Sequence, residues 1–458
     1  MTALAEVLLS RGARISGTDV ADTFYTDAIL SKLGIRCTTG FLPSDVPDGT
    51  RLVVHSAAYR REDNPQLIEA AARGIPLLVY PEALGLLSGH FDSSGVSGVH
   101  GKSTTTALCG VILKGWNAPA TVLTGTEVPA FGGRCTWTGG ERFFVAETCE
   151  YRRHFLHFHP QRILITSIEP EHLDYFKDLE DILAAFEEYG RSLPLHGALV
   201  YNHDDAGALE AARRILKRRD DLKAVPYGQT AEGDFRIDGI EMGSGEIRFA
   251  LHGFSGEFKL HVPGRHNVGN AAGALALCSL IRGTEGSRTP SDDLESARRS
   301  LAAFTGTRRR SEVVGEAGGV LFMDDYGHHP TAIRTTLEGL RAFHPDRRIV
   351  VDFASHTYSR TRTLLSDFAS CFGEADMVVL HKIYASARET ATGDISGRDL
   401  FREVEGRHPC VRYFEEPMEA VGFLRGALRP GDLFVTVGAG DNWKLGRELL
   451  RLAEGGVG

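Results

Sequence analysis

A glycine-rich stretch, Gly95–Thr106, constrains the fold of this chain more than any other feature of its sequence. It follows a short apolar run and leads into Ala107–Leu113, which we expect to be helical. A glycine-rich turn between a strand and a helix directs backbone N–H groups toward one point, and the helix dipole adds to the attraction for phosphate. The stretch therefore predicts a phosphate-binding loop within an α/β fold.

The spacing inside this stretch departs from the usual G-x-x-x-x-G-K-[ST] pattern, because Val96 stands where the first glycine is expected. The remaining pattern is Gly98-x-x-Gly101-Lys102-Ser103. In such a loop Lys102 reaches the outer phosphates and Ser103 offers its hydroxyl to Mg²⁺. The simpler alternative is an ordinary glycine-rich turn with a solvated lysine. The succession of strand, turn and helix favours the phosphate loop.

Length and charge limit the class of protein. A chain of 458 residues predicts about three domains. The net charge of −9 argues against a binder of duplex nucleic acid, which needs a large basic surface. The seven cysteines form no C-x-x-C pair, as expected for reduced thiols. There is neither an apolar run of about 18 residues nor a signal-like N-terminus, so we expect a cytoplasmic protein without a membrane partner.

The first ninety residues alternate helical and strand patterns. This alternation predicts a parallel, doubly wound sheet with ligands at the carboxyl ends of its strands. Asp19 and Ser56 fall at such ends, although Asp19 would serve equally well as a helix cap. A unit of this kind should begin with a strand and a glycine-rich turn, whereas this chain starts inside the first helix. We therefore expect the first strand to be missing.

Acidic residues and a histidine follow two later predicted strands. Glu147 and Glu150 come at the end of Phe143–Ala146, and His172 follows Ile163–Thr166. Carboxylates and an imidazole beside a phosphate loop are suitable ligands for a divalent ion that bridges nucleotide phosphates. Singly, each would more often belong to a buried pair or a helix cap. Their shared position at strand ends favours a metal site.

Two further groups of polar residues flank the predicted domain boundary. Asn267 and Asn270 place two amides on one face of a helix, near its N-terminus, and simple capping by Asn267 would explain one of them. The basic run Arg308–Arg310 is either a solvated linker or a substrate contact.

From Gly319 onward the chain again alternates strands and helices, which predicts a second doubly wound sheet. The expected strand ends carry Tyr326, His328 and His329, followed by Arg360. Adjacent histidines and an arginine suit an anionic or peptidic group, with the guanidinium gripping a carboxylate.

Six motifs in a fixed order resemble the Mur ligase family, and the resemblance spans essentially the whole chain. They are Ser97-Gly-Val-His-Gly-Lys-Ser-Thr-Thr-Thr106, Glu147-Thr-Cys-Glu150, Ile168-Glu-Pro-Glu-His-Leu-Asp174, Pro263-Gly-Arg-His-Asn267, Asp324-Asp-Tyr-Gly-His-His-Pro330 and His356-Thr-Tyr-Ser-Arg-Thr361. The histidine of the first motif and the fifth motif are typical of the alanine-adding branch and its recycling relative.

The resemblance implies three α/β domains. These are an N-terminal Rossmann-like domain for a UDP-sugar (residues 1–91, lacking its first strand and glycine-rich loop), a central P-loop ATPase domain (92–311) and a C-terminal Rossmann-like domain (312–458) that closes to exclude water. The implied reaction belongs to peptidoglycan synthesis. ATP phosphorylates the carboxylate of UDP-N-acetylmuramate, and the amine of L-alanine attacks the acyl phosphate. The alternatives are a ligase that attaches a preformed tripeptide to the same sugar and, because of the missing loop, an inactive nucleotide-binding homologue.

The resemblance also implies roles for particular residues. Lys102 would stabilise the transferring phosphoryl group, Ser103 and Glu147 would bind one Mg²⁺, and Glu147 with His172 a second. The implied nucleotide contacts are Gly98, His100, Gly101, Lys102, Ser103, Thr104, Asn267 and Asn270. The implied substrate contacts are Asp19, Ser56, Arg308, Tyr326, His328, His329 and Arg360. The implied catalytic residues are Lys102, His172, His329 and Arg360.

Three residues depart from the family pattern near the implied metal site. Ser167 and Glu171 stand where the His172 motif usually has asparagine and aspartate, and Cys149 replaces an acidic residue. We expect such altered side chains to shift the metal geometry without abolishing it.

Overall fold

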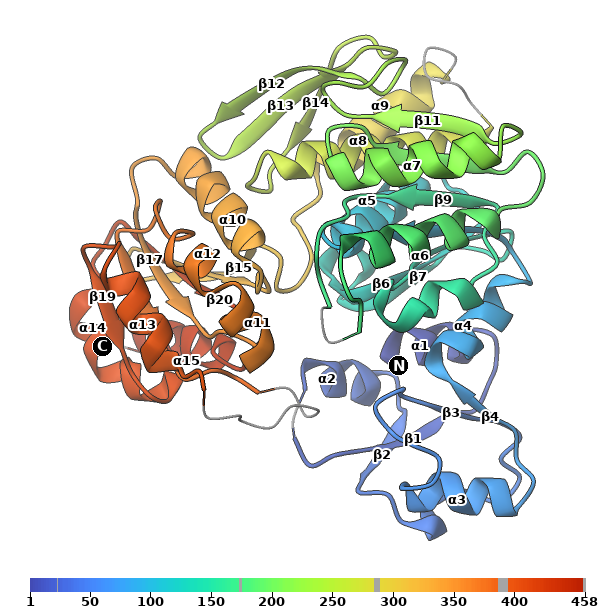
Figure 1. The fold of residues 1–458 in the computed structure, drawn as a ribbon, viewed down its shortest axis with the longest axis horizontal. Coiled ribbons are helices and arrows are strands. Elements are labelled where there is room, and N and C mark those ends of the chain that lie inside the picture. Colours follow the sequence, from blue (N-terminus) through green and yellow to red (C-terminus); the bar gives the residue numbers. More distant parts are fainter. Residues whose placement is uncertain (23, 173–174, 284–288, 386–393, 456–458) are drawn as a thin grey trace. The chain divides into compact units, whose positions relative to one another are not determined.

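The computed structural model describes residues 1–22, 24–172, 175–283, 289–385 and 394–455 (Figure 1). The chain divides into two compact units. The first comprises Met1–Ile237, Leu251–Ser255 and Asn270–Leu301, and the second Asp238–Ala250, Gly256–Gly269 and Ala302–Gly458. Within the described ranges no helix has both the length and the apolar character needed to cross a lipid bilayer.

The first unit is built on a seven-stranded sheet in the order β11-β10-β9-β5-β8-β6-β7. All of its strands pair in parallel except the edge strand β7, which runs antiparallel to β6. The strands are β5 (Asp92–Ser97), β6 (Ala120–Val128), β7 (Arg134–Thr138), β8 (Phe143–Glu147), β9 (Arg162–Ile165), β10 (Ala198–Asn202) and β11 (Lys223–Tyr227). Because β5 lies between β8 and β9, the loops after these three strands open at one edge of the sheet.

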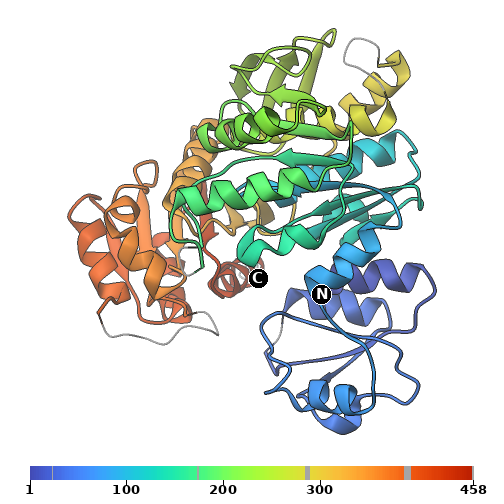
Figure 2. The ribbon, with the colours of Figure 1, turned by 45° about the vertical axis from the view of Figure 1, so that its right-hand side comes forward.

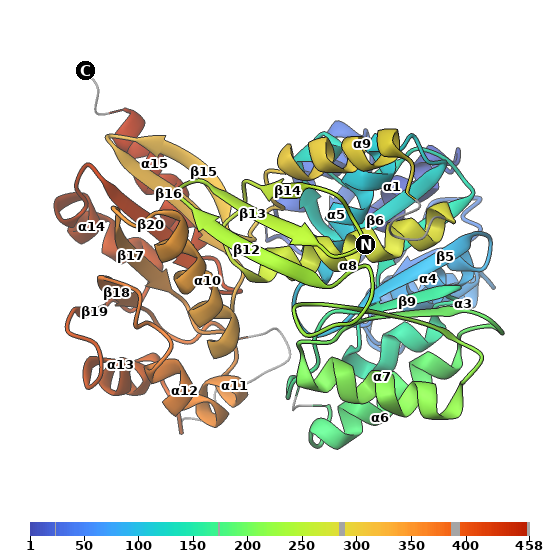
Figure 3. The same cartoon turned by 90° about the horizontal axis from the view of Figure 1, so that it is seen from above.

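Helices cover both faces of this sheet. Figure 3 shows α6 (Leu179–Arg191) and α7 (Ala206–Arg218) on one face and α5 (Lys102–Gly115) on the other. The face of α5 also carries residues 270–282 of α8 (His266–Arg282) and α9 (Ser291–Ala302). The short 3₁₀ segments η2 (Pro129–Phe131) and η3 (Tyr151–His157) follow β6 and β8. The result is the doubly wound arrangement expected around the phosphate loop.

The N-terminal part of the first unit contains four short strands. They pair in parallel, as predicted, but as two separate pairs, β1–β2 and β3–β4. Its elements are α1 (Thr2–Ser10), β1 (Ser16–Asp19), α2 (Tyr25–Lys32), β2 (Arg36–Thr39), η1 (Pro43–Asp45), β3 (Val53–His55), α3 (Pro65–Ala72), β4 (Leu77–Val79) and α4 (Tyr80–Ser88). Figure 2 shows α1 and α4 between these strands and the central sheet. The buried Glu6 of α1 accepts a hydrogen bond from the amide of Cys135 in β7, at 3.2 Å.

The second unit contains a six-stranded sheet in the order β15-β16-β20-β17-β18-β19, with only β15 antiparallel to its neighbour. The strands are β15 (Glu312–Ala317), β16 (Val320–Asp325), β17 (Arg348–Phe353), β18 (Met377–Leu380), β19 (Val411–Tyr413) and β20 (Asp432–Val437). Its helices are α10 (Pro330–Phe343), α11 (Tyr358–Thr363), α12 (Leu365–Ala369), α13 (Gly397–Glu405), η5 (Pro417–Ala420), α14 (Val421–Ala427) and α15 (Trp443–Glu454). A small sheet, β12 (Ile237–Gly243), β13 (Glu246–Leu251) and β14 (Glu257–Leu260), precedes α8.

Strand residues of the six-stranded sheet alternate between two hydrophobic cores. Val351 and Val435 pack with α10, α12 and α13, whereas their neighbours Val350 and Phe434 pack with α14 and α15. This alternation follows from the two-residue repeat of a strand. The second predicted doubly wound sheet is therefore confirmed.

Candidate active site

Two glycines shape the loop between β5 and α5. Gly98 has a φ of +132°, and a Cβ there would lie 2.2 Å from Oγ1 of Thr166. Gly101 has a φ of +79°, and its Cβ would lie 2.5 Å from Oδ1 of Asn270. Both positions thus exclude larger side chains on conformational and steric grounds.

The loop is tied to the segment that follows β9. The amide of Val99 donates to the carbonyl of Ser167 at 2.8 Å, and the amide of His100 donates to the Ser167 hydroxyl at 2.9 Å. The Thr166 hydroxyl donates to the carbonyl of His100. Because these two amides are engaged by Ser167, the amides available to an anion are those of the first turn of α5, which begins at Lys102.

Lys102 is not a solvated lysine. Its side chain is 13% exposed, and its ammonium contacts the carboxylate of Glu150 at 3.2 Å. It also donates to the carbonyls of Gly98 and Val99, so it lies folded back against its own loop. Burial alone would lower the pKa of Lys102, but the negative charge of Glu150 outweighs it and raises the pKa above its ordinary value.

Oxygen donors suited to magnesium lie beside this lysine. The Ser103 hydroxyl donates to Oε2 of Glu147 at 2.8 Å, and the amide of Gly125 donates to the same oxygen at 2.9 Å. A hydroxyl and a carboxylate at this separation, next to the N-terminus of α5, are hard oxygen ligands of the kind Mg²⁺ prefers. The residues present therefore fit a nucleotide-bound Mg²⁺.

His172 lies beside Glu150. Its Nε2 is 3.6 Å from Oε1 of Glu150, and its ring centroid is 4.6 Å from that of Tyr151. His172 has a φ of +55°, an uncommon conformation for a residue other than glycine. The end of its motif, Leu173 and Asp174, lies outside the described residues.

The other residues expected at the nucleotide also lie close to the loop or on α8. His100 is paired with Glu169, and Thr104 is buried in the first turn of α5. Asn270 accepts a hydrogen bond from the Thr105 hydroxyl at 3.2 Å, so its amide packs against the start of α5. Asn267 donates to the carbonyl of Pro263 at 2.8 Å from inside the first turn of α8 rather than from a capping position.

In the second unit, the basic run is part of the folded structure and not a solvated linker. Arg308 is half-buried, and Arg309 forms an ion pair with Asp324 at 2.9 Å. Arg309 also donates to the carbonyl of Gly438 at 2.7 Å, and Arg309 and Arg310 both lie over the ring of Tyr326. The sequence analysis did not assign this structural role to Arg309. The signal available in the sequence was the acidic Asp324, a suitable ion-pair partner.

Aromatic and imidazole rings gather at the carboxyl ends of β16, β17 and β18. Centroids are 5.3 Å apart for Tyr326 and His328, 6.3 Å for His328 and His356, and 6.1 Å for His356 and Tyr384. Arg360 donates to the carbonyl of His356 at 3.0 Å. The structure thus brings together three residues singled out in the sequence and adds His356 and Tyr384.

His329 has a different position from its neighbour His328. It is the N-cap of α10, where its Nδ1 accepts a hydrogen bond from the amide of Thr331 at 3.3 Å, and it is 8% exposed. This contact satisfies one backbone donor at the start of α10 and fixes the orientation of the His329 ring.

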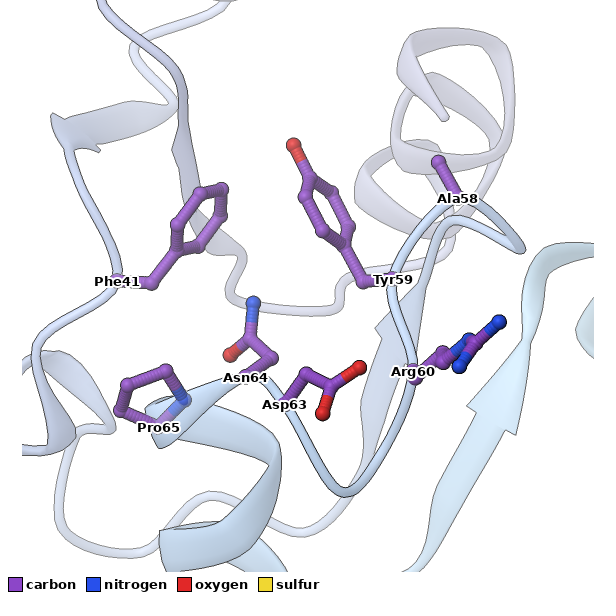
Figure 4. A pocket seen from close by; sticks show the side chains of 7 residues that line it. All are labelled: Phe41, Ala58, Tyr59, Arg60, Asp63, Asn64 and Pro65. Carbon is purple, nitrogen blue, oxygen red and sulfur yellow. The ribbon is translucent and has the colours of Figure 1, made fainter. Parts of the chain in front are cut away.

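A cleft opens at the carboxyl ends of the short N-terminal strands. Its volume is about 270 Å³, and its lining includes the rings of Phe41 and Tyr59, which contact each other at a tilt with centroids 4.8 Å apart (Figure 4). Burial, and then the charge of Asp19, raise the pKa of Tyr59. Asp19 itself is exposed, and Ser56 accepts a hydrogen bond from the amide of Ala58 at 3.2 Å. The sequence pointed to this edge but missed the two aromatic residues.

The fold and the loop geometry together define an α/β protein built around a mononucleotide-binding loop. Three family descriptions match the chain: "Mur ligase family, catalytic domain" over residues 1–92, "Mur ligase middle domain" over 96–278 and "Mur ligase, glutamate ligase domain" over 309–440. The chain belongs to the Mur ligase family, and its architecture comprises the three domains of that family.

Named relatives and solved structures agree with this assignment. A UDP-N-acetylmuramate–L-alanine ligase of Treponema pallidum is 53% identical over 98% of this chain and 93% of its own length. One from Desulfitobacterium hafniense is 40% identical, covering 98% of this chain and 97% of the relative. The crystal structure of a UDP-N-acetylmuramate–alanine ligase from Thermotoga maritima has the same fold, with a TM-score of 0.80, 24% identity and coverage of 99% and 96%.

Proposed function

We propose that this protein is an ATP-dependent ligase that joins L-alanine to the carboxylate of UDP-N-acetylmuramate, an acid–amino-acid ligation in peptidoglycan synthesis. The observation that carries the proposal is the grouping of Lys102, Ser103 and Glu147 at the N-terminus of α5. The 53% identity to an alanine ligase over nearly the whole chain supports the choice of amine over the tripeptide of the recycling relative. It also argues against an inactive homologue.

The chemistry follows from the charges that must be brought together. A carboxylate is a poor electrophile, and a phosphoryl group converts its oxygen into a good leaving group. Lys102 and the amides at the start of α5 stabilise the negative charge of the γ-phosphoryl group as it moves to the carboxylate. The Mg²⁺ ions, when bound, neutralise phosphate oxygens at Ser103 and Glu147. The alanine amine then attacks the acyl carbon, and phosphate leaves.

Residues of the second unit fit the amino acid. Arg360 supplies a guanidinium for the alanine carboxylate, and Arg308 of the basic run adds a second positive charge. Tyr326 and His328 line the same strand ends, and we assign to His329 the acceptance of a proton from the amine. We assign these roles together with domain boundaries at residues 1–91, 92–311 and 312–458. Because ATP is consumed, we also place the enzyme in the cytoplasm, where ATP is regenerated.

The metal assignment predicts a specific defect. We propose two Mg²⁺ ions, the first held by Ser103 and Glu147 and the second by Glu147 and His172, with Gly98, His100, Gly101, Thr104, Asn267 and Asn270 around the nucleotide. His172→Ala should raise the Mg²⁺ concentration for half-maximal activity about tenfold, because one ligand is lost. A magnesium titration of initial rates measures it, with the exposed His90→Ala as control. An unchanged titration would refute the role of His172.

The cleft of Figure 4 fits the uridine of the sugar nucleotide. A base stacked on the ring of Tyr59 gains about 1–3 kcal/mol, and Asp19 and Ser56 lie at the same strand ends. Tyr59→Ala should therefore raise the KM for UDP-N-acetylmuramate about tenfold with little change in kcat, since the base is remote from the reacting carboxylate. Tyr59→Phe keeps the ring and should keep the KM. Equal KM values for Tyr59→Ala and the unaltered protein would show that the uridine does not bind in this cleft.

Phosphate release tests the overall proposal. The protein is supplied with ATP, Mg²⁺ and UDP-N-acetylmuramate, and then with alanine, glycine, serine or a stem tripeptide. We expect release with alanine, accompanied by an amide product in mass spectrometry. Release with the tripeptide alone would indicate the recycling ligase. ATP binding without any amide product would indicate a nucleotide-binding protein lacking ligase activity.

A further inference from the structure

Glu150 is a buried acid that the proposed reaction leaves without a role. Its side chain is 2% exposed, deeper than Lys102 or His172, and both of its oxygens face the ammonium of Lys102, at 3.2 and 3.4 Å. Glu150 and Lys102 thus form an ion pair that is largely withdrawn from solvent.

The backbone after Glu150 holds this carboxylate in place. Arg152 and Arg153 both have positive φ, 53° and 58°, so the chain turns sharply within η3. Arg153 anchors the turn to α6 through ion pairs with Asp181 at 2.8 Å and Glu188 at 2.9 Å. Two consecutive left-handed residues other than glycine are costly, and such strain persists where the surrounding structure enforces it.

Lys102 consequently has two competing sets of partners. One set consists of the carboxylate of Glu150 and the carbonyls of Gly98 and Val99, which bind its ammonium in the structure. To contact a terminal phosphate, the lysine must exchange the carboxylate for phosphate oxygens. Glu150 also repels the incoming polyanion, since both carry negative charge at short range in a poorly hydrated site.

We propose that Glu150 is a positioning residue that holds Lys102 in a retracted state and makes nucleotide binding depend on magnesium. The inference rests on the proposed function of the loop as an ATP site. Nucleotide bound to Mg²⁺ carries less negative charge and overcomes the repulsion, whereas metal-free ATP does not. When Lys102 binds phosphate oxygens instead, the carboxylate of Glu150 stays in contact with His172. That contact orients the imidazole of His172 toward the proposed metal site.

Equilibrium binding of ATP in EDTA, by titration calorimetry, tests this role. Glu150→Gln keeps the size and an acceptor oxygen but removes the charge, and we expect it to tighten metal-free ATP binding about tenfold. Glu150→Asp keeps the charge and should stay within about twofold of the unaltered protein. The gain should be smaller in excess Mg²⁺. A merely structural role predicts the opposite, weaker binding by Glu150→Gln, together with a lower melting temperature.

The matched control is Glu187→Gln. Glu187 is another largely buried glutamate of the first unit, paired with Arg191 and Arg218 on α6 and α7, and its loss should leave ATP affinity unchanged. The inference is overturned if Glu150→Gln binds Mg²⁺-ATP but binds metal-free ATP no more tightly than the unaltered protein does. Failure of the unaltered protein to bind Mg²⁺-ATP would instead overturn the proposed function.

Discussion

Replacement of Lys102 by alanine is expected to lower kcat about a thousandfold, because the moving phosphoryl group loses its principal cation. The rate of phosphate release at saturating ATP, UDP-N-acetylmuramate and alanine measures this loss. The same change should destabilise the fold by about 3 kcal/mol, since it leaves the buried carboxylate of Glu150 without its main partner. A lysine on a solvated loop would have had no such effect.

The double variant Lys102→Ala/Glu150→Gln separates the two effects. Removing both charges should restore most of the lost stability, measured as the thermal midpoint, without restoring activity. If Lys102→Ala alone kept activity within tenfold of the unaltered protein, the phosphate loop would not be the site of phosphoryl transfer.

Asp352→Asn in the second unit is expected to give the largest loss of stability, about 3–5 kcal/mol near pH 6, because it breaks a fully buried ion pair. Oδ2 of Asp352 lies 2.6 Å from Nε2 of His381, and both side chains are 0% exposed. The amide of Asn442 donates to the other oxygen of Asp352 at 2.9 Å. Hydrogen exchange of the amides of β17 and β18 measures the free energy of opening of this sheet in the full chain.

The loss should depend on pH in a defined direction. Burial would lower the pKa of His381, but the charge of Asp352 and its hydrogen bond raise it above the ordinary value. The pair thus contributes its full stability below about pH 6.5, the pKa of an unfolded histidine, and loses it as pH rises through the higher folded pKa. The difference between Asp352→Asn and the unaltered protein should shrink from pH 6 to pH 9.

An exposed ion pair in the same unit provides the control. Glu316 contacts Arg347 at 2.8 Å with its side chain 51% exposed, and Glu316→Gln should change little because solvent screens the pair. A loss in Asp352→Asn that is the same at pH 6 and pH 9 would mean that His381 is neutral in the folded protein.

Elements with a clear hydrophobic pattern could be predicted from the sequence. The strands β8, β17 and β20 are short apolar runs followed by polar turns, and their residues are buried on both sides in parallel sheets. The order of strands and helices then indicates which loops share an edge, and it predicts that Lys102, Glu147 and His172 lie at the same edge of the sheet. Elements with mixed composition, such as β6 with its Thr-Gly-Thr segment, were missed.

Pairing within the site could not be predicted in the same way. Two glutamates lie at or just after the end of β8, and only the side-chain geometry shows that Glu147 accepts from Ser103 while Glu150 faces Lys102. The turn that follows Glu150 has a left-handed backbone at two arginines, whereas glycine is the residue that usually indicates this conformation in a sequence. Similarly, Arg309 belongs to a basic run whose members look equivalent in the sequence, and only the structure shows its ion pair with Asp324.

Ser167 accepts hydrogen bonds from two amides of the phosphate loop, so contacts within the protein itself order the main chain around Val99 and His100. Its conformational entropy is lost during folding and not during binding, which leaves more of the interaction energy for affinity. The site is in this sense preorganised. Loss of the hydrogen bonds from the loop to Ser167 would therefore weaken nucleotide binding. The weakening would come from a less ordered main chain.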